Sequence, residues 1–323
     1  MPMTNNEPWV LVCGSIALDF VGRYDGSFAD YQDRYDIKAL NISLQLTELH
    51  TSFGGCGMNI TYGLHKLSTP VTPLSAAGVD FMDHYHQHLT TIGIRTEYIA
   101  VDSSLPRCAT ALVIGDSKGN QITGFHAGAS PSLMRKLPSE IEDIAQCRIA
   151  ILAPEDAPIM LRQARDLHGL DIPIIFDPGQ GIAEFTEADI RELLTLSNTL
   201  IINAHEYEIL QHNSGLSDEA VQNMVEKVII TNGAKGVNVY TSGEMDHVDG
   251  IAKARIVDST GCGDAFRAGY LYGLMQDVDA NVCAELGCVL AAVNLENIDT
   301  QTYDIDAAGL WARHEAAYGK PDQ

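Results

Sequence analysis

A glycine-rich stretch late in the chain, Val257 to Gly269, combines residues that could hold a phosphate with one that could accept a proton. Gly261 and Gly263 can adopt backbone conformations closed to residues with a Cβ, so successive N–H groups can converge on one anion. The apolar residues that follow at helical spacing predict a helix, whose first N–H groups and dipole favour negative charge. Asp264, at the start of this helix, could take a proton from an attacking hydroxyl. The alternative is a glycine turn in which Asp264 only caps the helix.

A second glycine-rich stretch, Phe53 to Leu64, also leads into a predicted helix. Gly54 and Gly55 permit the backbone to approach a ligand closely. Asn59 lies about one turn into the helix, and its amide can both donate and accept hydrogen bonds. This combination suits a ligand that carries several hydroxyl groups, and close packing at a helix N-terminus is the alternative.

Polar residues also follow the first predicted strand. Trp9 to Cys13 is a short apolar run of the kind that forms a buried strand, and Ser15 and Asp19 come soon after it. Open α/β sheets bind their ligands at the carboxyl ends of the strands. These two residues are therefore candidates for a binding site, and a polar turn after a core strand is the alternative.

Alternating strands and helices make up most of the rest of the chain. Apolar runs at 148–152, 173–176, 199–202 and 228–231 are separated by helical patterns such as Pro158 to His168. This order predicts a parallel sheet that is covered by helices on both faces. Three polar segments follow the strands, namely Asp177-Pro-Gly-Gln180, Asn203-Ala-His-Glu206 and Thr231 to Gly236.

Two segments break this order by alternating apolar and polar residues, which indicates strands with one exposed face. They are Ile42 to His50 and Ala109 to Phe125, the latter with a predicted turn at Asp116 to Asn120. We expect a small β flap built from about residues 20–51 and 98–127, which would serve as an active-site lid or as a dimer surface. No linker or repeat divides the sequence, so we expect a single domain over residues 1–323.

The composition disfavours several classes of partner. The formal net charge of −23, with no run of Lys or Arg, argues against nucleic acid and anionic membranes. The sequence has no apolar run near the roughly 18 residues that span a bilayer, and its polar start lacks a signal-peptide pattern. Seven scattered cysteines without metal-site spacing indicate reduced thiols, and we expect a cytoplasmic location. His84 and His88 have metal-ligand spacing, but no nearby glutamate completes a motif, and we expect a solvated surface.

Four motifs together resemble those of the ribokinase-like (PfkB) family of sugar and nucleoside kinases. They are Gly54-Gly55 with Asn59, Asn203-x-x-Glu206, Thr231-x-Gly233 with Gly236, and Asp258-Ser-Thr-Gly-Cys-Gly-Asp264. Each is weak alone, but their order and spacing agree from Ser15 to about Tyr303. Within the family, the chain looks most like the bacterial ribokinase-type adenosine kinases. That narrower resemblance rests on Phe125-His-Ala-Gly-Ala129, Asp177-Pro-Gly-Gln180, Gly263-Asp-Ala-Phe-Arg-Ala-Gly269 and Thr300-Gln-Thr-Tyr303.

The resemblance implies an α/β fold, a three-layer sandwich with a central, mostly parallel sheet and a small β lid. It implies transfer of the γ-phosphoryl group of ATP to a primary hydroxyl, so that adenosine and ATP would give AMP and ADP. Mg²⁺ would be required, and a K⁺-like ion would stimulate the reaction. The expected partners are a small nucleoside or sugar and, through the lid, a second copy of the chain.

The resemblance also assigns the residues that act on the phosphoryl group. Asp264 matches the general base that takes the proton from the 5′-hydroxyl. Gly261, Cys262 and Gly263 match an anion hole whose amides stabilise the phosphoryl oxygens. Cys262 stands where Ala or Val is common, and this departure changes little because the backbone N–H does the work.

Other matched positions belong to ATP and its ions. Asn203 and Glu206 match the pair that organises magnesium, with Glu206 acting largely through water. Asp258 and Thr260 match positions near the monovalent cation. The nucleotide loop is matched by Thr231, Gly233 and Gly236.

On the acceptor side, Asp19 and Asn59 match the groups that hold the 2′- and 3′-hydroxyls of the ribose. Gly181 stands where a second polar residue is expected beside Gln180, which puts selectivity for adenine in doubt. The remaining assignments are Gly54 and Gly55 to the sugar through their backbone, Ser15 and Gln180 to the base edge, and Phe125 to stacking on adenine.

Alternative functions stay open on this evidence. One is a sugar kinase of the ribose or fructose type, or a nucleoside kinase of broader specificity, and another is a non-catalytic nucleoside-binding protein on the same fold. A dinucleotide oxidoreductase is disfavoured because Gly14-Ser15-Ile16 is not a G-x-G-x-x-G fingerprint. Cys56 and Cys262 lie near helix N-termini, which lower thiol pKa values, so we hypothesise that their oxidation or alkylation blocks the enzyme. Two buried, inert thiols are the alternative.

Overall fold

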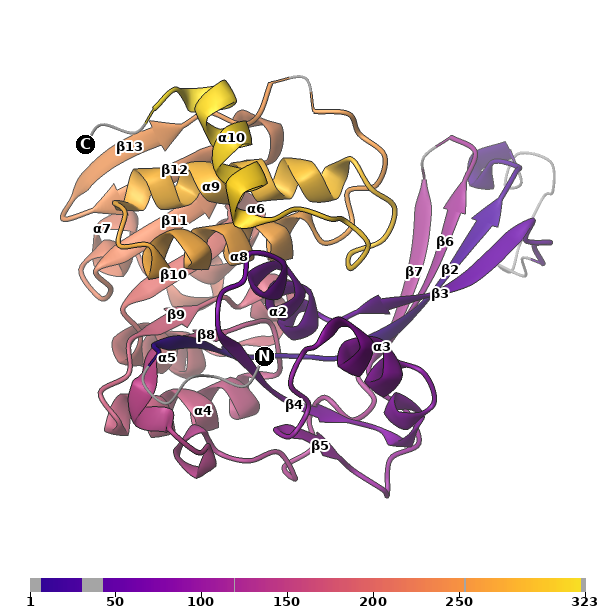
Figure 1. The fold of residues 1–323 in the computed structure, drawn as a ribbon, viewed down its shortest axis with the longest axis horizontal. Helices are drawn as coiled ribbons and strands as arrows, with labels where there is room; N and C mark the ends of the chain where they lie inside the picture. The colour runs from indigo at the N-terminus through magenta and orange to yellow at the C-terminus, as the bar shows by residue number, and fades with distance from the viewer. Residues whose placement is uncertain (1–6, 31–42, 119, 253, 321–323) are drawn as a thin grey trace.

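The computed structural model describes residues 7–30, 43–118, 120–252 and 254–320. Within these residues, nine strands form one large sheet in the order β13-β12-β11-β10-β9-β8-β1-β4-β5 (Figure 1). Neighbouring strands from β5 to β11 run parallel, and β12 and β13 are antiparallel. The strands are β1 (Trp9–Cys13), β4 (Val71–Ala77), β5 (Ile99–Val101), β8 (Cys147–Leu152), β9 (Ile174–Phe176), β10 (Thr199–Asn203), β11 (Lys227–Thr231), β12 (Val237–Thr241) and β13 (Glu244–Val248).

Helices cover both faces of this sheet and bury its central strands. Every residue of β1 is buried, and its side chains alternate between two hydrophobic cores. The core that contains Val10 and Val12 packs under α2 (Cys56–Lys66), α3 (Tyr85–Ile92), α8 (Cys262–Met275), α9 (Ala280–Leu295) and α10 (Ala307–Tyr318). The core that contains Trp9 and Leu11 packs under α4 (Ala157–Gly169), α5 (Glu187–Leu196), α6 (Ala204–Ser214) and α7 (Asp218–Gln222). The predicted three-layer α/β sandwich is confirmed.

Four further strands form a small second sheet that projects from one side of the sandwich (Figure 1). Their order is β3-β2-β6-β7, with β2 (Ala17–Tyr24), β3 (Glu48–Gly54), β6 (Thr110–Asp116) and β7 (Gln121–His126). β2 pairs antiparallel with β3 and parallel with β6, so the two predicted ribbons join into one sheet. We call this sheet the lid.

The lid differs from the sequence-based expectation in detail. Of the alternating segment from Ile42 to His50, the strand includes only residues from Glu48 onward, and Ile42 lies outside the described residues. β5 falls within the expected range 98–127 but pairs with β4 in the large sheet. Short 3₁₀ segments complete the described elements, namely η1 (Val79–Met82), η2 (Pro138–Glu140), η3 (Ile144–Gln146), η4 (Gly179–Glu184) and η5 (Gly233–Lys235).

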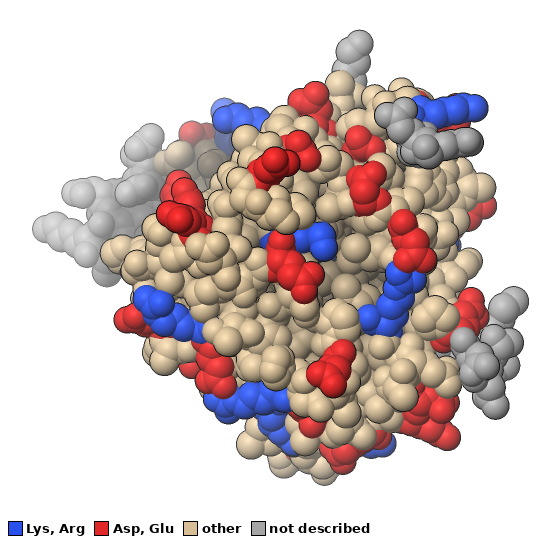
Figure 2. Space-filling view, turned by 90° about the vertical axis from the view of Figure 1, so that its left-hand side faces the viewer, with Lys and Arg blue, Asp and Glu red and all other residues tan. Residues whose placement is uncertain are grey.

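The charge of the chain is dispersed on the face that Figure 2 shows, where acidic side chains are scattered and several Lys and Arg side chains lie beside them. Pairs such as Arg165 with Glu192 and Arg191 with Glu187 are exposed. Such pairs contribute little to stability but keep opposite charges interspersed. Among the described helices, none has the length and apolar character needed to cross a membrane.

Candidate active site

The predicted polar segments meet at one edge of the large sheet, where the carboxyl ends of the parallel strands lie. Ser15 follows β1, Asp177 follows β9, and Asn203 and Thr231 end the neighbouring strands β10 and β11, in which they are paired. Helix α2 begins directly after β3, and α8 packs against α2. The N-termini of both helices lie at this edge. This edge is the candidate active site.

Close packing of α2 and α8 depends on small side chains. A Cβ on Gly63 would lie 2.6 Å from the Cβ of Ala268 and 2.8 Å from the hydroxyl of Tyr303. Real Cβ atoms do not approach that closely, so Gly63 is required for the two helices to pack as they do. This contact brings Asn59 of α2 to Asp264 of α8, 205 positions apart in the chain.

Asp264 is the third residue of α8 and does not cap the helix. The N-cap is Gly261, in the left-handed conformation with φ 74°, and it provides no side-chain cap. Asp264 Oδ2 instead accepts a hydrogen bond of 2.7 Å from Asn59 Nδ2. Burial raises the pKa of Asp264 to about 6, although the Asn59 hydrogen bond, Arg267 and the Cys56 thiol each lower it. A carboxylate with this pKa is ionised at neutral pH and remains basic enough to accept a proton.

The loop before Asp264 leaves backbone donors exposed to a ligand. The first N–H groups of a helix have no acceptor within the helix, and no side chain caps α8. A Cβ on Gly261 would meet the side chain of Thr300 at 2.5 Å, so only glycine fits there. The N–H of Cys262 makes a long hydrogen bond of 3.4 Å to the carbonyl of Ser259. The turn of Gly261, Cys262 and Gly263 suits an anion through its backbone N–H groups and the helix dipole once that long bond gives way.

A buried ion pair supports Asp264 from the next turn of α8. Arg267 donates to Asp177 through Nε at 2.7 Å and Nη2 at 2.8 Å, and its Nη1 donates to the carbonyl of Gly263 at 3.2 Å. Both side chains are almost completely buried. Two parallel hydrogen bonds fix the guanidinium plane and so join α8 to the end of β9. Both residues lie in the motifs named above, but nothing in the sequence indicates that they pair.

On the acceptor side, Asp19 of the lid lies beside the glycine pair. Asp19 Oδ1 accepts from the N–H of Ala111 at 3.1 Å, and its Oδ2 occupies the space that a Cβ on Gly54 would need. Burial raises the pKa of Asp19. The strand registers place Ser52, Asp19, Ala111 and Phe125 in one row, on one face of the lid. Phe125 is 69% exposed on that face, as a residue that stacks on a ligand would be.

The remaining acceptor residues lie at the same edge of the sheet. Ser15 is half-buried, and its carbonyl accepts from the N–H of Met58 at 3.3 Å. Gly55 has φ 92° and is the N-cap of α2, so it needs the conformational freedom of glycine. Gln180 is exposed and is the second residue of η4, which begins directly after Pro178. Its neighbour Gly181 adds no side chain.

The nucleotide residues form two neighbouring strand ends. Asn203 and Glu206 cap α6 reciprocally. The N–H of Glu206 donates to Asn203 Oδ1 at 2.8 Å, and the N–H of Asn203 donates to Glu206 Oε2 at 3.1 Å. Burial raises the pKa of Glu206. Gly233 and Gly236 have φ values of 57° and 94°, and a Cβ on Gly236 would collide with the carbonyl of Val248. The backbone turn after Thr231 therefore requires both glycines.

Asp258 and Thr260 organise the loop that leads to the anion turn. Asp258 accepts from the N–H of Thr260 at 2.9 Å and from the N–H of Asp299 at 3.0 Å. Asn294 Nδ2 donates to the carbonyl of Thr260 at 2.7 Å, and its Oδ1 is buried without a hydrogen-bond partner. In the part of the chain that the structure describes, no three His, Cys, Asp or Glu side chains converge as metal ligands.

Two expectations about side chains are wrong. Burial raises the pKa of both Cys56 and Cys262, although we expected lower values at helix N-termini. Desolvation of a thiolate outweighs the helix dipole here. We also expected His88 to be solvated, but it stacks on Phe53 with ring centroids 4.2 Å apart and donates to Gln301 at 3.0 Å. Nothing near His88 in the sequence indicates its contacts with Phe53 and Gln301.

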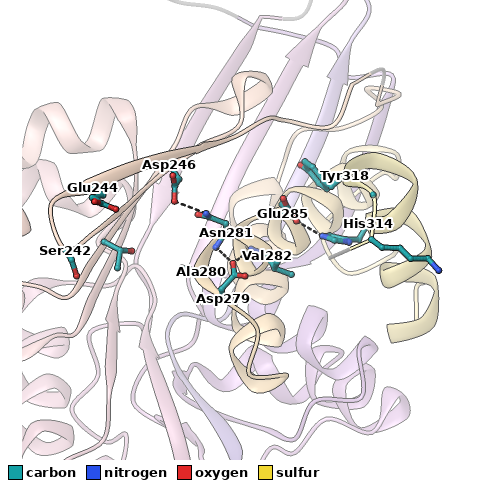
Figure 3. A pocket seen from close by; sticks show the side chains of 13 residues that line it. Ser242, Glu244, Asp246, Asp279, Ala280, Asn281, Val282, Glu285, His314 and Tyr318 are labelled. Carbon is teal, nitrogen blue, oxygen red and sulfur yellow. Dashed lines mark hydrogen bonds and ion pairs between the residues drawn. The ribbon is translucent and has the colours of Figure 1, made fainter. Parts of the chain in front are cut away.

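A cavity of about 630 Å³ lies far from these residues, and its lining includes the acidic residues Glu244, Asp246, Asp279 and Glu285 (Figure 3). β12 runs away from the candidate site to Thr241, and α9 starts at the same remote end. Some polar groups of this cavity bond to one another, as in the Asn281 bond to Asp246 and the His314 bond to Glu285, whereas His314 Nδ1 is buried without a hydrogen-bond partner. We place the active site at the strand ends, where the motif residues meet, and not in this cavity.

Comparisons with known proteins find one matching family model and several similar proteins. The chain matches the model of the pfkB family carbohydrate kinase over residues 10–307. It is 27% identical to a nucleoside kinase of Methanocaldococcus jannaschii over 265 residues, which are 81% of this chain and 85% of the relative. The structure of Burkholderia thailandensis nucleoside kinase in complex with inosine superposes with a TM-score of 0.85 at 30% identity, over 96% of this chain and 98% of that one. The same protein in complex with ADP-inosine gives a TM-score of 0.83 at 29% identity, over 97% of each chain.

Proposed function

Because this chain belongs to the pfkB family of carbohydrate kinases, we propose that it transfers the γ-phosphoryl group of ATP to the 5′-hydroxyl of a nucleoside, with adenosine preferred. The observation that carries this proposal is the carboxylate of Asp264 beside the uncapped N-terminus of α8, next to Asn59. The Burkholderia protein, whose structure holds inosine, supports a nucleoside as the acceptor. A kinase that accepts several nucleosides is the alternative.

Asp264 would accept the proton of the 5′-hydroxyl as the oxygen attacks phosphorus. The amides of Gly261, Cys262 and Gly263 would neutralise the phosphoryl oxygens in transit, where preorganised donors have their largest effect. Phosphoryl transfer depends on positioning and charge neutralisation more than on covalent help. Asn59 donates one N–H to Asp264, and we assign its second N–H to a ribose hydroxyl beside Asp19.

The ATP side rests on the strand ends. We assign Thr231, Gly233 and Gly236 to the nucleotide, in line with the ADP that the similar Burkholderia structure contains. Glu206 and Asn203 offer one buried carboxylate and, among the described residues, not a complete ligand cage. This fits Mg²⁺, which would keep most of its water ligands and bind phosphate oxygens. Mg²⁺ would neutralise the phosphate oxygens. The unpartnered Oδ1 of Asn294, near Asp258 and Thr260, fits a K⁺-like ion that prefers oxygen ligands.

Acceptor preference would be set on the lid and at η4. Phe125 would stack on the base, Ser15 and Gln180 would contact its edge, and the backbone of Gly54 and Gly55 would approach the sugar. A flat aromatic contact accepts any purine, so discrimination among purines depends on the few hydrogen bonds at the base edge. Few such groups are present, which keeps a broader nucleoside kinase, and a ribose or fructose kinase, as alternatives.

The proposed function predicts release of ADP from ATP and Mg²⁺ only when an acceptor is added. A coupled ADP assay with adenosine, inosine, guanosine, ribose and fructose at equal concentrations ranks the alternatives by kcat/KM. We expect adenosine to give the highest value and the free sugars the lowest. Ribose or fructose well ahead of every nucleoside would reject the nucleoside assignment, and binding of adenosine without any turnover would indicate a binding protein.

The outer face of the lid supports a proposed homodimer. Its apolar side chains are opposite the Asp19 row in the strand register, and they include Leu49, Leu112 and Ile122, which are 62%, 48% and 45% exposed. Exposed apolar patches of this kind mark contact surfaces. We expect a dimer in sedimentation equilibrium and a monomer for the Leu49→Lys/Leu112→Lys variant. A wild-type monomer at micromolar concentration would reject this surface.

We place the reaction in the cytoplasm, where free thiols such as the seven found here remain reduced.

A further inference from the structure

A continuous series of buried and partly buried hydrogen bonds connects helix α3 with the carboxylate of Asp264. Its central member is Gln301, which is 6% exposed and precedes α10. Gln301 Nε2 donates to Asn59 Oδ1 at 3.0 Å and to the hydroxyl of Tyr85 at 2.7 Å. Gln301 Oε1 accepts from His88 Nε2 at 3.0 Å. Each polar atom of the Gln301 side chain therefore has a partner.

When Asp264 is ionised, only one arrangement of donors and acceptors satisfies this series of hydrogen bonds. An ionised carboxylate only accepts hydrogen bonds, so the N–H of Asn59 must face Asp264. Asn59 Oδ1 then faces the opposite way and requires a donor, which Gln301 Nε2 provides. This orientation turns Gln301 Oε1 towards His88, whose Nε2 carries a proton in both the charged ring and the matching neutral tautomer.

Thr300 also approaches Asn59 but cannot replace Gln301. Its hydroxyl lies 2.8 Å from Asn59 Oδ1 and 2.8 Å from the carbonyl of Phe53. A hydroxyl has one proton, so it serves one of these two acceptors at a time. Gln301 is thus the donor that holds the Asn59 amide continuously.

We propose that Gln301 is a positioning residue for phosphoryl transfer, because it holds the Asn59 amide in the orientation that donates a hydrogen bond to Asp264. This inference deepens the proposed function and rests on the role of Asp264 as the base. If Gln301 were absent, Asn59 could rotate and present its oxygen to the carboxylate. Two facing oxygens repel unless Asp264 is protonated, and a protonated Asp264 cannot act as a base.

The same series of hydrogen bonds reaches the base of the lid. The hydroxyl of Tyr85 accepts from Gln301 and donates to the carbonyl of Gly54, at the end of β3, at 2.7 Å. Phe53 in the same strand stacks on His88. One set of contacts therefore holds both the backbone of Gly54, which is assigned to the sugar, and the carboxylate of Asp264, which is assigned to the hydroxyl of the sugar.

The pH dependence of kcat tests this inference, because it follows the ionisation of Asp264. In Gln301→Met the side-chain volume is kept but the donor is lost. We expect the acid limb of the kcat profile to move to higher pH by roughly one unit, a part of what one hydrogen bond to a charged group contributes. The double variant Thr300→Val/Gln301→Met should move it further. Other groups near Asp264 remain unchanged in these variants, namely Cys56, Arg267, Asp177, Cys262 and Tyr303.

The matched control is Gln163→Met. Gln163 is also buried, at 2% exposed, and its side-chain amide has no hydrogen-bond partner among the described residues. It lies in α4, under the other face of the sheet, so the acid limb should stay where it is in wild type. Thermal unfolding of each variant checks that the chain folds, and KM for the acceptor separates binding from proton transfer.

Epistasis shows whether Gln301 acts through Asn59. In the Asn59→Ala background, adding Gln301→Met should move the acid limb no further. A wild-type acid limb in Gln301→Met, or an equal shift with and without Asn59, would overturn the inference while the kinase assignment stands. Full activity of an Asp264→Asn variant would instead overturn the role of Asp264 itself.

Discussion

Asp264→Asn is expected to lower kcat by about 10² to 10⁴-fold, the range for one acid–base group, with little change in the affinity for either substrate. The amide keeps the size of the side chain but cannot take up the proton of the hydroxyl. Steady-state kinetics under saturating ATP would give kcat and KM for the acceptor. Asp277→Asn is a suitable control because that exposed carboxylate lies just beyond the far end of α8. Near-wild-type turnover in Asp264→Asn would remove Asp264 from the mechanism.

The pH profile provides a second readout of the same residue. Burial raises the pKa of Asp264 to about 6, and in the proposed mechanism the ionised form is the active one. Turnover of the wild type should therefore rise with pH through about 6 and then level off, whereas the residual turnover of Asp264→Asn should lack this limb. A wild-type acid limb near pH 4, where an ordinary aspartate titrates, would show that burial does not control this group.

Arg267→Met is expected to destabilise the fold by about 3 to 5 kcal/mol, because it leaves the carboxylate of Asp177 buried without its partner. The same change removes the positive charge that lowers the pKa of Asp264. The acid limb of kcat should therefore move to higher pH in whatever fraction of the variant folds. Urea unfolding followed by circular dichroism measures the loss of stability.

Arg165→Met provides a geometric match for this test. Arg165 also donates two hydrogen bonds, of 2.6 and 2.8 Å, to one carboxylate, that of Glu192, but the pair is exposed. Its loss should cost about 0.2 to 1 kcal/mol. The double variant Asp177→Leu/Arg267→Met should recover much of the stability, since an apolar pair can replace a buried ion pair. Equal losses in Arg267→Met and Arg165→Met would show that burial of the pair does not matter.

Some backbone conformations at the candidate site are encoded locally. The turn at Gly261 to Gly263 and the capping box of Asn203 with Glu206 are each encoded within a few neighbouring residues. Their conformations follow from missing Cβ atoms and from short polar side chains that bond to the nearby backbone. The parallel strands were also predictable, since strands buried on both faces form short, continuous apolar runs.

The contacts between distant segments were not predictable in this way. Nothing near Gln301 in the sequence indicates that it donates to Asn59, 242 positions earlier, or that Arg267 pairs with Asp177, 90 positions away. The raised thiol pKa values belong to the same class, because burial depends on which elements pack over a residue and not on its neighbours in the chain.

The sequence by itself determined the order of the elements and the glycine turns, because these depend on local backbone chemistry and on apolar periodicity, and the resemblance of its motifs indicated the family. Only the tertiary structure decided how the carboxylate of Asp264 is held and tuned. Its ionisation depends on desolvation and on hydrogen bonds from α2, α8 and the segment before α10, and these groups come together only when the helices pack.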